Sequence, residues 1–134
     1  MSNPYVLAIT PDGIVDSLLV HFNSLDVDVM LGFYDKEAIL IDAAGHPQVG
    51  TAAIATELKK YFSFGLPMHI TARHIFVAGD IASLVLDWSI VGTGPDGNQV
   101  HIVATANDIA RCGSDGFWRY LIDNPFGTAI RRLA

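Results

Sequence analysis

The sequence predicts an α+β domain in which helices from the first half of the chain cover an antiparallel sheet built by the second half. Apolar residues recur at helical spacing in the first half, and long runs rich in Val, Ile and aromatic residues fill the second half. Short turn sequences join these runs, which makes neighbouring strands antiparallel. No internal repeat or linker divides the 134 residues, so we expect one domain over residues 1–134.

Three helices are expected in the first half of the chain. Pro11 suits the first position of the first helix, and Ile14, Leu18 and Phe22 then recur at helical spacing. Asn23 interrupts this pattern, and a second apolar stripe begins after it. A turn containing Gly and Pro separates a short strand from the third helix. The expected helices cover 11–22, 26–34 and 52–64, and the short strand covers 38–42.

Four longer strands are expected in the second half. Each apolar run is separated from the next by residues that favour turns. The turn sequences are Gly79-Asp80, Pro95-Asp96-Gly97-Asn98 and Gly113-Ser114-Asp115-Gly116. Turns this short connect antiparallel neighbours. The expected strands cover 68–78, 81–93, 99–112 and 117–124.

The composition argues against several classes of partner. The formal net charge is −6, and no run of basic residues is longer than two, so we expect binding to neither nucleic acid nor an anionic membrane surface. The five histidines lack the spacing of a metal site, and no phosphate-binding glycine motif is present. We therefore expect no metal and no other cofactor.

The single cysteine and the N-terminal sequence indicate the compartment. Cys112 cannot form an intrachain disulfide and is expected to be a buried thiol in a reducing environment. The sequence MSNPYVLAIT has no basic leader, and no apolar run approaches the length of a membrane span. A cytoplasmic protein is the expectation.

Each of the three long strands has one face that carries an aspartate, because side chains alternate between the two faces of a strand. These aspartates are Asp87, Asp108 and Asp123. If the three faces coincide, the carboxyl groups line one concavity. The alternative is that the inner and outer faces are reversed, so that the aspartates face solvent as most strand aspartates do. The residues that share these faces include Ser83, Val85, Ala104, Ala106, Ala110 and Leu121.

Small side chains surround Asp108 in the stretch ATANDIA, residues 104–110. A buried strand normally carries larger apolar residues at such positions. The alanines therefore indicate either an empty space for a ligand or a helix that packs closely against the strand.

The opposite faces of these strands carry much of the bulk. A sheet that is covered by helices on one side usually exposes a polar face on the other, so a bulky outer face indicates a second cover. We expect a homodimer that packs through this outer sheet face. On the segment 81–93 the bulky residues are Leu84, Leu86, Trp88 and Ile90.

Two segments resemble a known superfamily. The stretch AILIDAAGHPQVGTAAI, residues 38–54, is similar to part of the bacterial ketosteroid isomerases, and WRYLIDNPFGTA, residues 118–129, resembles the tail of SnoaL-like proteins. The resemblance covers nearly the whole chain and implies the nuclear transport factor 2-like, or cystatin-like, fold. In this fold three helices close a cone-shaped, curved antiparallel sheet. The superfamily includes isomerases, dehydratases, hydrolases, cyclases and non-catalytic modules.

The resemblance also implies roles for particular residues. Asp42 falls at the position of the general base, and Asp108 at that of the oxyanion-hole acid, which an apolar site keeps neutral in ketosteroid isomerase. Tyr34 falls where the family has a supporting tyrosine in its pocket. Leu18 occupies the place of the family's principal oxyanion tyrosine and cannot donate a hydrogen bond. The implied pocket is lined by Leu18, Phe22, Ser83, Val85, Asp87, Ala106, Leu121 and Asp123.

Three functions are compatible with this pocket. The first is an enzyme that moves a proton next to a carbonyl group of a small hydrophobic or polycyclic ligand, with Asp42 as base and Asp108 as hydrogen-bond donor. The second is a hydratase, dehydratase or epoxide hydrolase, in which Asp87, Asp108 and Asp123 position a water molecule. The third is a ligand-binding module without catalysis.

Overall fold

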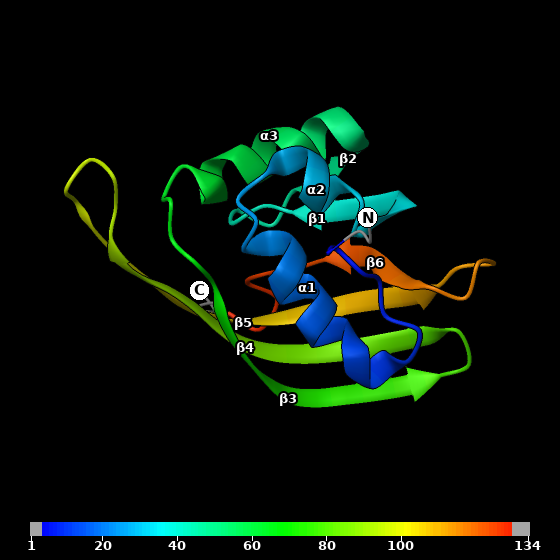
Figure 1. The fold of residues 1–134 in the computed structure, drawn as a ribbon. Coiled ribbons are helices and arrows are strands. Elements are labelled where there is room, and N and C mark those ends of the chain that lie inside the picture. The colour runs from blue at the N-terminus through cyan, green and yellow to red at the C-terminus, as the bar shows by residue number, and fades with distance from the viewer. Residues whose placement is uncertain (1–3, 130–134) are drawn as a thin grey trace.

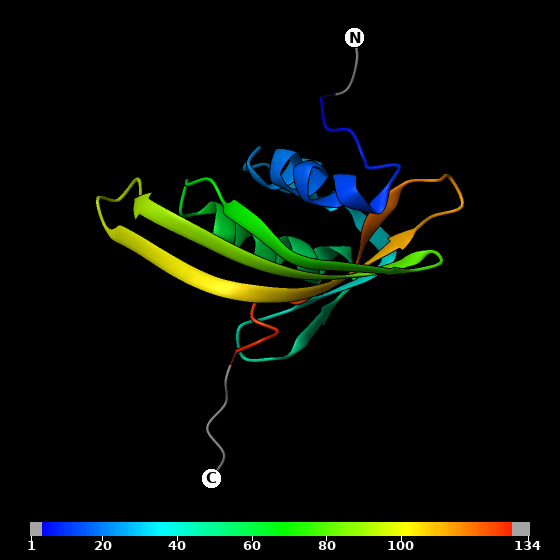
Figure 2. The same cartoon turned by 90° about the horizontal axis from the view of Figure 1, so that it is seen from below.

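The computed structural model describes residues 4–129, which form a curved six-stranded mixed sheet with three helices on one of its faces (Figures 1 and 2). The helices are α1 (Ile14–Phe22), α2 (Val27–Leu31) and α3 (Thr51–Phe62), and a 3-10 turn, Pro11–Gly13, precedes α1. The strands are β1 (Tyr34–Ile41), β2 (Pro47–Val49), β3 (His69–Ala78), β4 (Ile81–Thr93), β5 (Gln99–Cys112) and β6 (Trp118–Asp123). The α+β class and the curved sheet are confirmed.

The first two helices follow from the local sequence, but the second is shorter than expected. Asp26 caps α2, and its carboxylate accepts a hydrogen bond from the N–H of Asp28 at 2.9 Å. The helix ends at Leu31, and Tyr34 begins β1 instead of ending the helix. The reason is tertiary, because Tyr34 pairs with Tyr120 of β6.

The long antiparallel strands lie where the sequence predicts them. β4 and β5 have the expected bounds, β3 begins one residue later than expected, and β6 is one residue shorter at each end. Gly97 and Gly116 both have a φ of 84° in the connecting turns, a conformation that glycine adopts without steric cost. These local turn signals are the reason that the second half of the chain is predictable.

The strand order is β2-β1-β6-β5-β4-β3, and one pair departs from the expected antiparallel pattern. β1 lies parallel to β6, although about eighty positions separate them in the chain. β2 was not expected. It pairs antiparallel with β1 and forms one edge of the sheet. Parallel strands come from segments that are far apart in the chain, so no turn sequence between them predicts that they pair.

The bulky face of β4 is the inner face, which corrects the expectation. Leu84 and Leu86 are fully buried and pair with Asp108 and Ala106 of β5. Because directly paired residues share a face, the side chain of Asp108 points inward with the leucines. The buried residues of β4 are Ala82, Leu84, Leu86, Trp88 and Ile90, so Ser83, Val85 and Asp87 lie on the outer face.

A register shift in β6 places two polar residues on the inner face. Tyr120 pairs with Ala110, whereas Ile122 pairs with Ile109, so Leu121 is an extra residue between the two pairs. Such a bulge changes the alternation of side chains. Both Tyr120 and Asp123 consequently point inward, which a strict alternation does not predict for the pair.

The homodimer was expected to pack through the bulky residues of β4 on the outer face of the sheet. These residues lie on the inner face instead and are buried under the helices: Leu84, Leu86, Trp88 and Ile90. The outer face still exposes Phe76, Val91 and Val103 at 62%, 48% and 65%. The homodimer therefore stays a prediction, and these three apolar side chains support it. Among the described residues, no helix has the length and apolarity needed to cross a bilayer.

Candidate functional site

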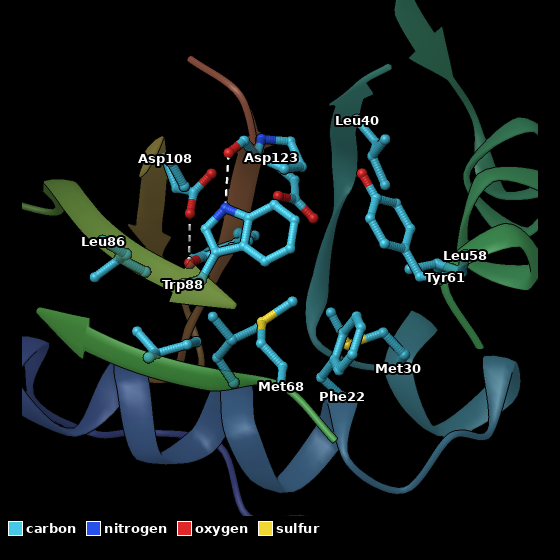
Figure 3. A pocket seen from close by; sticks show the side chains of 15 residues that line it. Phe22, Met30, Leu40, Leu58, Tyr61, Met68, Leu86, Trp88, Asp108 and Asp123 are labelled. Atoms are coloured by element: carbon cyan, nitrogen blue, oxygen red, sulfur yellow. Dashed lines mark hydrogen bonds between the residues drawn. The ribbon is translucent and has the colours of Figure 1, made fainter. Parts of the chain in front are cut away.

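A cavity lies between the three helices and the inner face of the sheet (Figure 3). Its volume is about 40 Å³, which is room for about three water molecules. Apolar side chains form most of the wall, and carboxyl groups face the cavity from β5 and β6. The lining residues are Leu18, Phe22, Met30, Leu40, Leu58, Tyr61, Met68, Ile70, Leu86, Trp88, Ala106, Asp108, Tyr120, Asp123 and Pro125.

Asp108 and Asp123 form an acid pair in this wall. The side chain of Asp108 is 2% exposed and accepts two hydrogen bonds, from the Tyr120 hydroxyl at 2.8 Å and from the backbone N–H of Asn124 at 2.7 Å. Asp123 accepts a hydrogen bond from the Tyr34 hydroxyl at 2.5 Å. Every buried polar side-chain atom among the described residues has a partner, as a stable buried polar cluster requires.

Burial raises the pKa of both acids. For Asp108 the pKa lies well above its ordinary value, first because of desolvation and second because of the charge of Asp123, and the hydrogen bonds from Asn124 and Tyr120 oppose this rise. Desolvation likewise raises the pKa of Asp123, to about 6, against the hydrogen bond from Tyr34. Two acids in contact titrate as a unit, and the negative charge of Asp123 favours the protonated form of Asp108.

The tyrosines around the pair act as hydrogen-bond donors. Burial, followed by the negative charge of the neighbouring acids, raises the pKa of Tyr34, Tyr61 and Tyr120 far above the physiological range. Each phenol therefore keeps its proton at neutral pH. Tyr34 and Tyr120 donate to the two acids, and Tyr61 faces the cavity from α3 (Figure 3).

The structure brings together a part of the site that the sequence predicts. Asp108, Asp123 and Tyr34 are joined by hydrogen bonds and buried contacts at one end of the cavity. Three further residues expected in the pocket, Leu18, Phe22 and Ala106, line its wall.

Four residues expected in the pocket lie elsewhere. Ser83, Val85 and Asp87 are on the outer face, because the leucines of β4 fill the inner one. Asp87 accepts hydrogen bonds from the guanidinium of Arg73 at 2.6 and 3.2 Å and from the hydroxyl of Thr105 at 2.6 Å. The fourth, Leu121, is the extra residue of the β6 bulge and is absent from the lining of the cavity.

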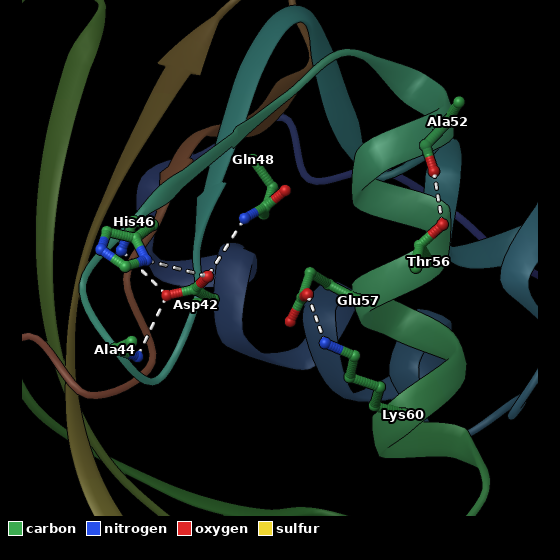
Figure 4. A network of polar contacts seen from close by, with 8 residues as sticks. All are labelled: Asp42, Ala44, His46, Gln48, Ala52, Thr56, Glu57 and Lys60. Atoms are coloured by element: carbon green, nitrogen blue, oxygen red, sulfur yellow. Dashed lines mark hydrogen bonds and ion pairs between the residues drawn. The ribbon is translucent and has the colours of Figure 1, made fainter.

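Asp42 also lies outside the lining of the cavity, so its expected role as the general base stays a prediction that this geometry does not support. Its carboxylate organises the turn between β1 and β2 and accepts hydrogen bonds from the backbone N–H of His46 and of Ala44 and from the Gln48 amide (Figure 4). The bond from the His46 N–H is the main reason that the pKa of Asp42 is lowered. An acid held ionised in a surface turn is a structural acceptor.

Sequence reasoning missed several lining residues, chiefly Tyr120, Trp88 and Tyr61. Trp88 shares its strand face with Leu84 and Leu86, and the greater bulk of that face was the available signal that it points inward. Tyr120 could not be assigned, because its position beside Asp108 depends on the β6 bulge. The helix that carries Tyr61 was expected, but its rotation against the sheet is decided by tertiary packing.

No group of three or more His, Cys, Asp or Glu side chains within residues 4–129 is arranged to hold a metal ion. The two cavity carboxyl groups are already engaged by tyrosine hydroxyls, a backbone N–H and each other. What the arrangement offers chemically is one proton donor and one proton acceptor side by side in an apolar space.

Sequence comparison finds a family for most of the chain. Residues 15–121 match the sequence model of the SnoaL-like domain. No curated protein matches the sequence significantly.

Solved structures share the fold at low sequence identity. A ketosteroid isomerase-like protein from Erwinia carotovora is 16% identical with a TM-score of 0.67, covering 84% of this chain and 89% of its own. A nuclear transport factor 2-like superfamily protein from Salmonella enterica is 16% identical with a TM-score of 0.69, covering 92% and 94%. A candidate calcium/calmodulin-dependent protein kinase II association domain from Thiobacillus denitrificans is 19% identical with a TM-score of 0.69, covering 86% and 92%.

Proposed function

Because the chain belongs to the SnoaL-like domain family, we propose that it is a small-molecule enzyme that moves a proton next to a carbonyl group. The fold includes ketosteroid isomerases and dehydratases, which is compatible with this reaction. The observation that carries the proposal is a pair of acids, the buried Asp108 and the half-buried Asp123, in the wall of an apolar cavity.

Each acid of the pair has a separate role in the proposed reaction. Asp123, whose pKa is about 6, is ionised at neutral pH and removes a proton from the carbon next to the carbonyl. Asp108, whose pKa is raised well above its ordinary value by burial and by the charge of Asp123, carries the proton and donates a hydrogen bond to the oxygen as its negative charge develops. Asp123 then returns the proton to the same carbon or to a conjugated one, so the reaction needs no further reactant.

This assignment replaces Asp42 as the base and leaves the role expected for Asp108 unchanged. Leu18 lines the cavity but has no hydroxyl to offer the substrate oxygen. In this chain Tyr120 lies beside Asp108 and Tyr34 beside Asp123, so both tyrosines orient the acids. The hydroxyl of Tyr61, which has no hydrogen bond to either acid among those described, is available to a ligand.

The cavity favours a small ligand. A free volume of about 40 Å³ admits a few heavy atoms without rearrangement. A polycyclic ligand needs side chains of the wall to move, and Met30 and Met68 are the flexible members of that wall. We therefore expect the substrate to be a small, mostly apolar ketone or enone.

Proton abstraction can be tested without knowing the natural substrate. Acetone, 2-butanone and cyclobutanone are incubated with the protein in D₂O, and loss of the α-proton signals is followed by NMR. We expect at least one ketone to exchange faster with the protein, and Asp123→Asn to lower that rate by about 100-fold or more. The matched control is Asp87→Asn on the outer face, which leaves the rate unchanged. Equal rates with the wild-type protein and Asp123→Asn for all three ketones would overturn the proposal.

A hydratase is the second candidate, and the small size of the cavity favours it. Two neighbouring acids, one protonated and one ionised, can position and activate a water molecule that attacks an enone or an epoxide. Incubation of 3-buten-2-one and propylene oxide in H₂¹⁸O, with mass analysis of the products, separates this reaction from proton transfer. Ligand binding without exchange or hydration would instead indicate a binding module.

A further inference from the structure

A tryptophan on β4 holds the chain segment that contacts the acid pair. The indole N–H of Trp88 donates a buried hydrogen bond to the carbonyl oxygen of Pro125 at 2.8 Å. The preceding residue, Asn124, directs its backbone N–H at Asp108 Oδ1 at 2.7 Å. We propose that Trp88 is a positioning residue, whose indole fixes the turn after β6 so that the Asn124 N–H stays on Asp108. Its catalytic consequence rests on the proposed function, whereas the positioning itself does not.

The indole reaches this turn by crossing an intervening strand. Trp88 lies on β4 and Pro125 follows β6, and β5 lies between those strands in the sheet. The cross-strand partner of Trp88 on β5 is Ala104, and Ala106 lies one inward position further along. Larger side chains at these alanines would occupy the space of the indole. The small residues beside Asp108 are thus explained by Trp88 as well as by the cavity.

Trp88 provides both polar and apolar attachment for the turn. Its ring packs against that of Phe126 with 5.4 Å between centroids, in addition to the bond to Pro125. Pro125 has no N–H of its own to anchor the segment. The turn is also tight, because a Cβ on Gly127 would lie 2.6 Å from the side-chain nitrogen of Asn124.

The turn influences the carboxyl group of Asp108 through the Asn124 N–H, which is one of the two hydrogen-bond donors to that group. The titratable groups that face Asp108 are Asp123 and Tyr120 from β6, Tyr34 from β1 and Tyr61 from α3. Burial and the charge of Asp123 raise the pKa of Asp108, and the Asn124 N–H and the Tyr120 hydroxyl oppose them. A turn that no longer holds the N–H in place should therefore let this pKa rise further.

The test uses Trp88→Phe, which keeps an aromatic ring and removes the indole N–H. The carboxyl groups are titrated by ¹³C NMR, together with the amide proton of Asn124. We expect the upper apparent pKa of the acid pair to rise by about 0.5 to 1, and the pH-dependent shift of the Asn124 amide to shrink. The matched control is Phe126→Leu, which removes the neighbouring ring and keeps the indole bond. It should change both titrations less than Trp88→Phe does, because the indole bond to Pro125 remains.

A folded Trp88→Phe variant with unchanged carboxyl and Asn124 titrations would overturn the inference. If that variant does not fold, hydrogen exchange of the wild-type protein decides instead. The indole proton of Trp88 and the amide proton of Asn124 should then open together with equal protection, and unequal protection contradicts the inference. These measurements need no substrate, so a protein without ketone exchange would refute the proposed function and leave this inference intact.

Discussion

The hydroxyl of Tyr34 donates a hydrogen bond to Asp123 Oδ2 across the parallel pair of β1 and β6. The two residues are 89 positions apart in the chain, and Tyr34 is buried whereas Asp123 is half-buried. The bond opposes the effect of burial on the pKa of Asp123. It therefore connects the topology of the sheet directly to the protonation of the proposed base.

Tyr34→Phe should raise the pKa of Asp123 above about 6, since the variant removes the hydrogen bond that stabilises the ionised carboxylate. A hydrogen bond to a charged group contributes roughly 1.5–3 kcal/mol, which corresponds to a rise of about 1 to 2 in the pKa. Carboxyl ¹³C NMR measures it. Tyr61→Phe is the matched control, because Tyr61 lines the same cavity without a described bond to Asp123. Equal titration of Asp123 in both variants and the wild-type protein would show that Tyr34 has no influence.

The stability of the protein should fall as the pH rises through about 6. Asp123 has an ordinary pKa of 3.8 when unfolded and about 6 when folded, so between these values the folded state binds more protons than the unfolded state. The stabilisation that proton binding to Asp123 gives the folded state is fully present below pH 3.8 and is lost as the pH rises through about 6. The difference in pKa corresponds to about 3 kcal/mol.

Asp123→Asn should remove this pH dependence, because the amide does not ionise. Urea unfolding at pH 4.5 and pH 7.5 is expected to show the variant more stable than the wild-type protein at the higher pH only. Asp87→Asn serves as the control, since Asp87 is a surface acid whose pKa is lowered, first by the hydrogen bond from Thr105. A variant that keeps the wild-type pH profile would contradict a desolvated acid at position 123.

Met30→Ala should enlarge the cavity at a clear cost in stability. Met30 is 1% exposed, and loss of such a side chain from a core typically costs about 2–5 kcal/mol. Met68→Ala should cost less, because Met68 is only half-buried. Both variants are expected to bind indole more tightly than the wild-type protein, as measured by NMR titration. Val49→Ala, at a site 69% exposed, is the control for stability and binding.

Val103→Glu should convert the expected homodimer into a monomer. Val103 is 65% exposed on the outer face of the sheet, where a buried charge without a partner would oppose association. Light scattering coupled to size exclusion gives the mass of each form. Val49→Glu is the matched control, because Val49 is equally exposed on the edge strand β2. A wild-type protein that is already a monomer at high concentration would rule the homodimer out.

The sequence predicted the elements of the second half well, since turn residues and apolar runs act locally. Gly97 and Gly116, both with a positive φ, lie in the turns that separate the long strands. The candidate site was predicted less completely. Asp108, Asp123 and Tyr34 were named, whereas Tyr120 and Trp88 were missed.

Tertiary pairing decided which acids reach the site. The helices cover the bulky face of β4, which places Asp87 on the outer face. The bulge at Leu121 put Tyr120 and Asp123 on one face, and a bulge arises from strand pairing that no local pattern reports. Asp42, by contrast, is held by local hydrogen bonds from the backbone N–H groups of Ala44 and His46 in the turn between β1 and β2.

By itself the sequence determined the fold class, the order of the helices and the long strands, and the presence of acids in the sheet. Local propensities and apolar spacing act over a few residues, so they can be read along the chain. Only the tertiary structure decided which acids share a cavity, because that depends on register and on contacts between residues far apart in sequence. The desolvation that raises the pKa of Asp108 and Asp123 exists only once those contacts exclude water.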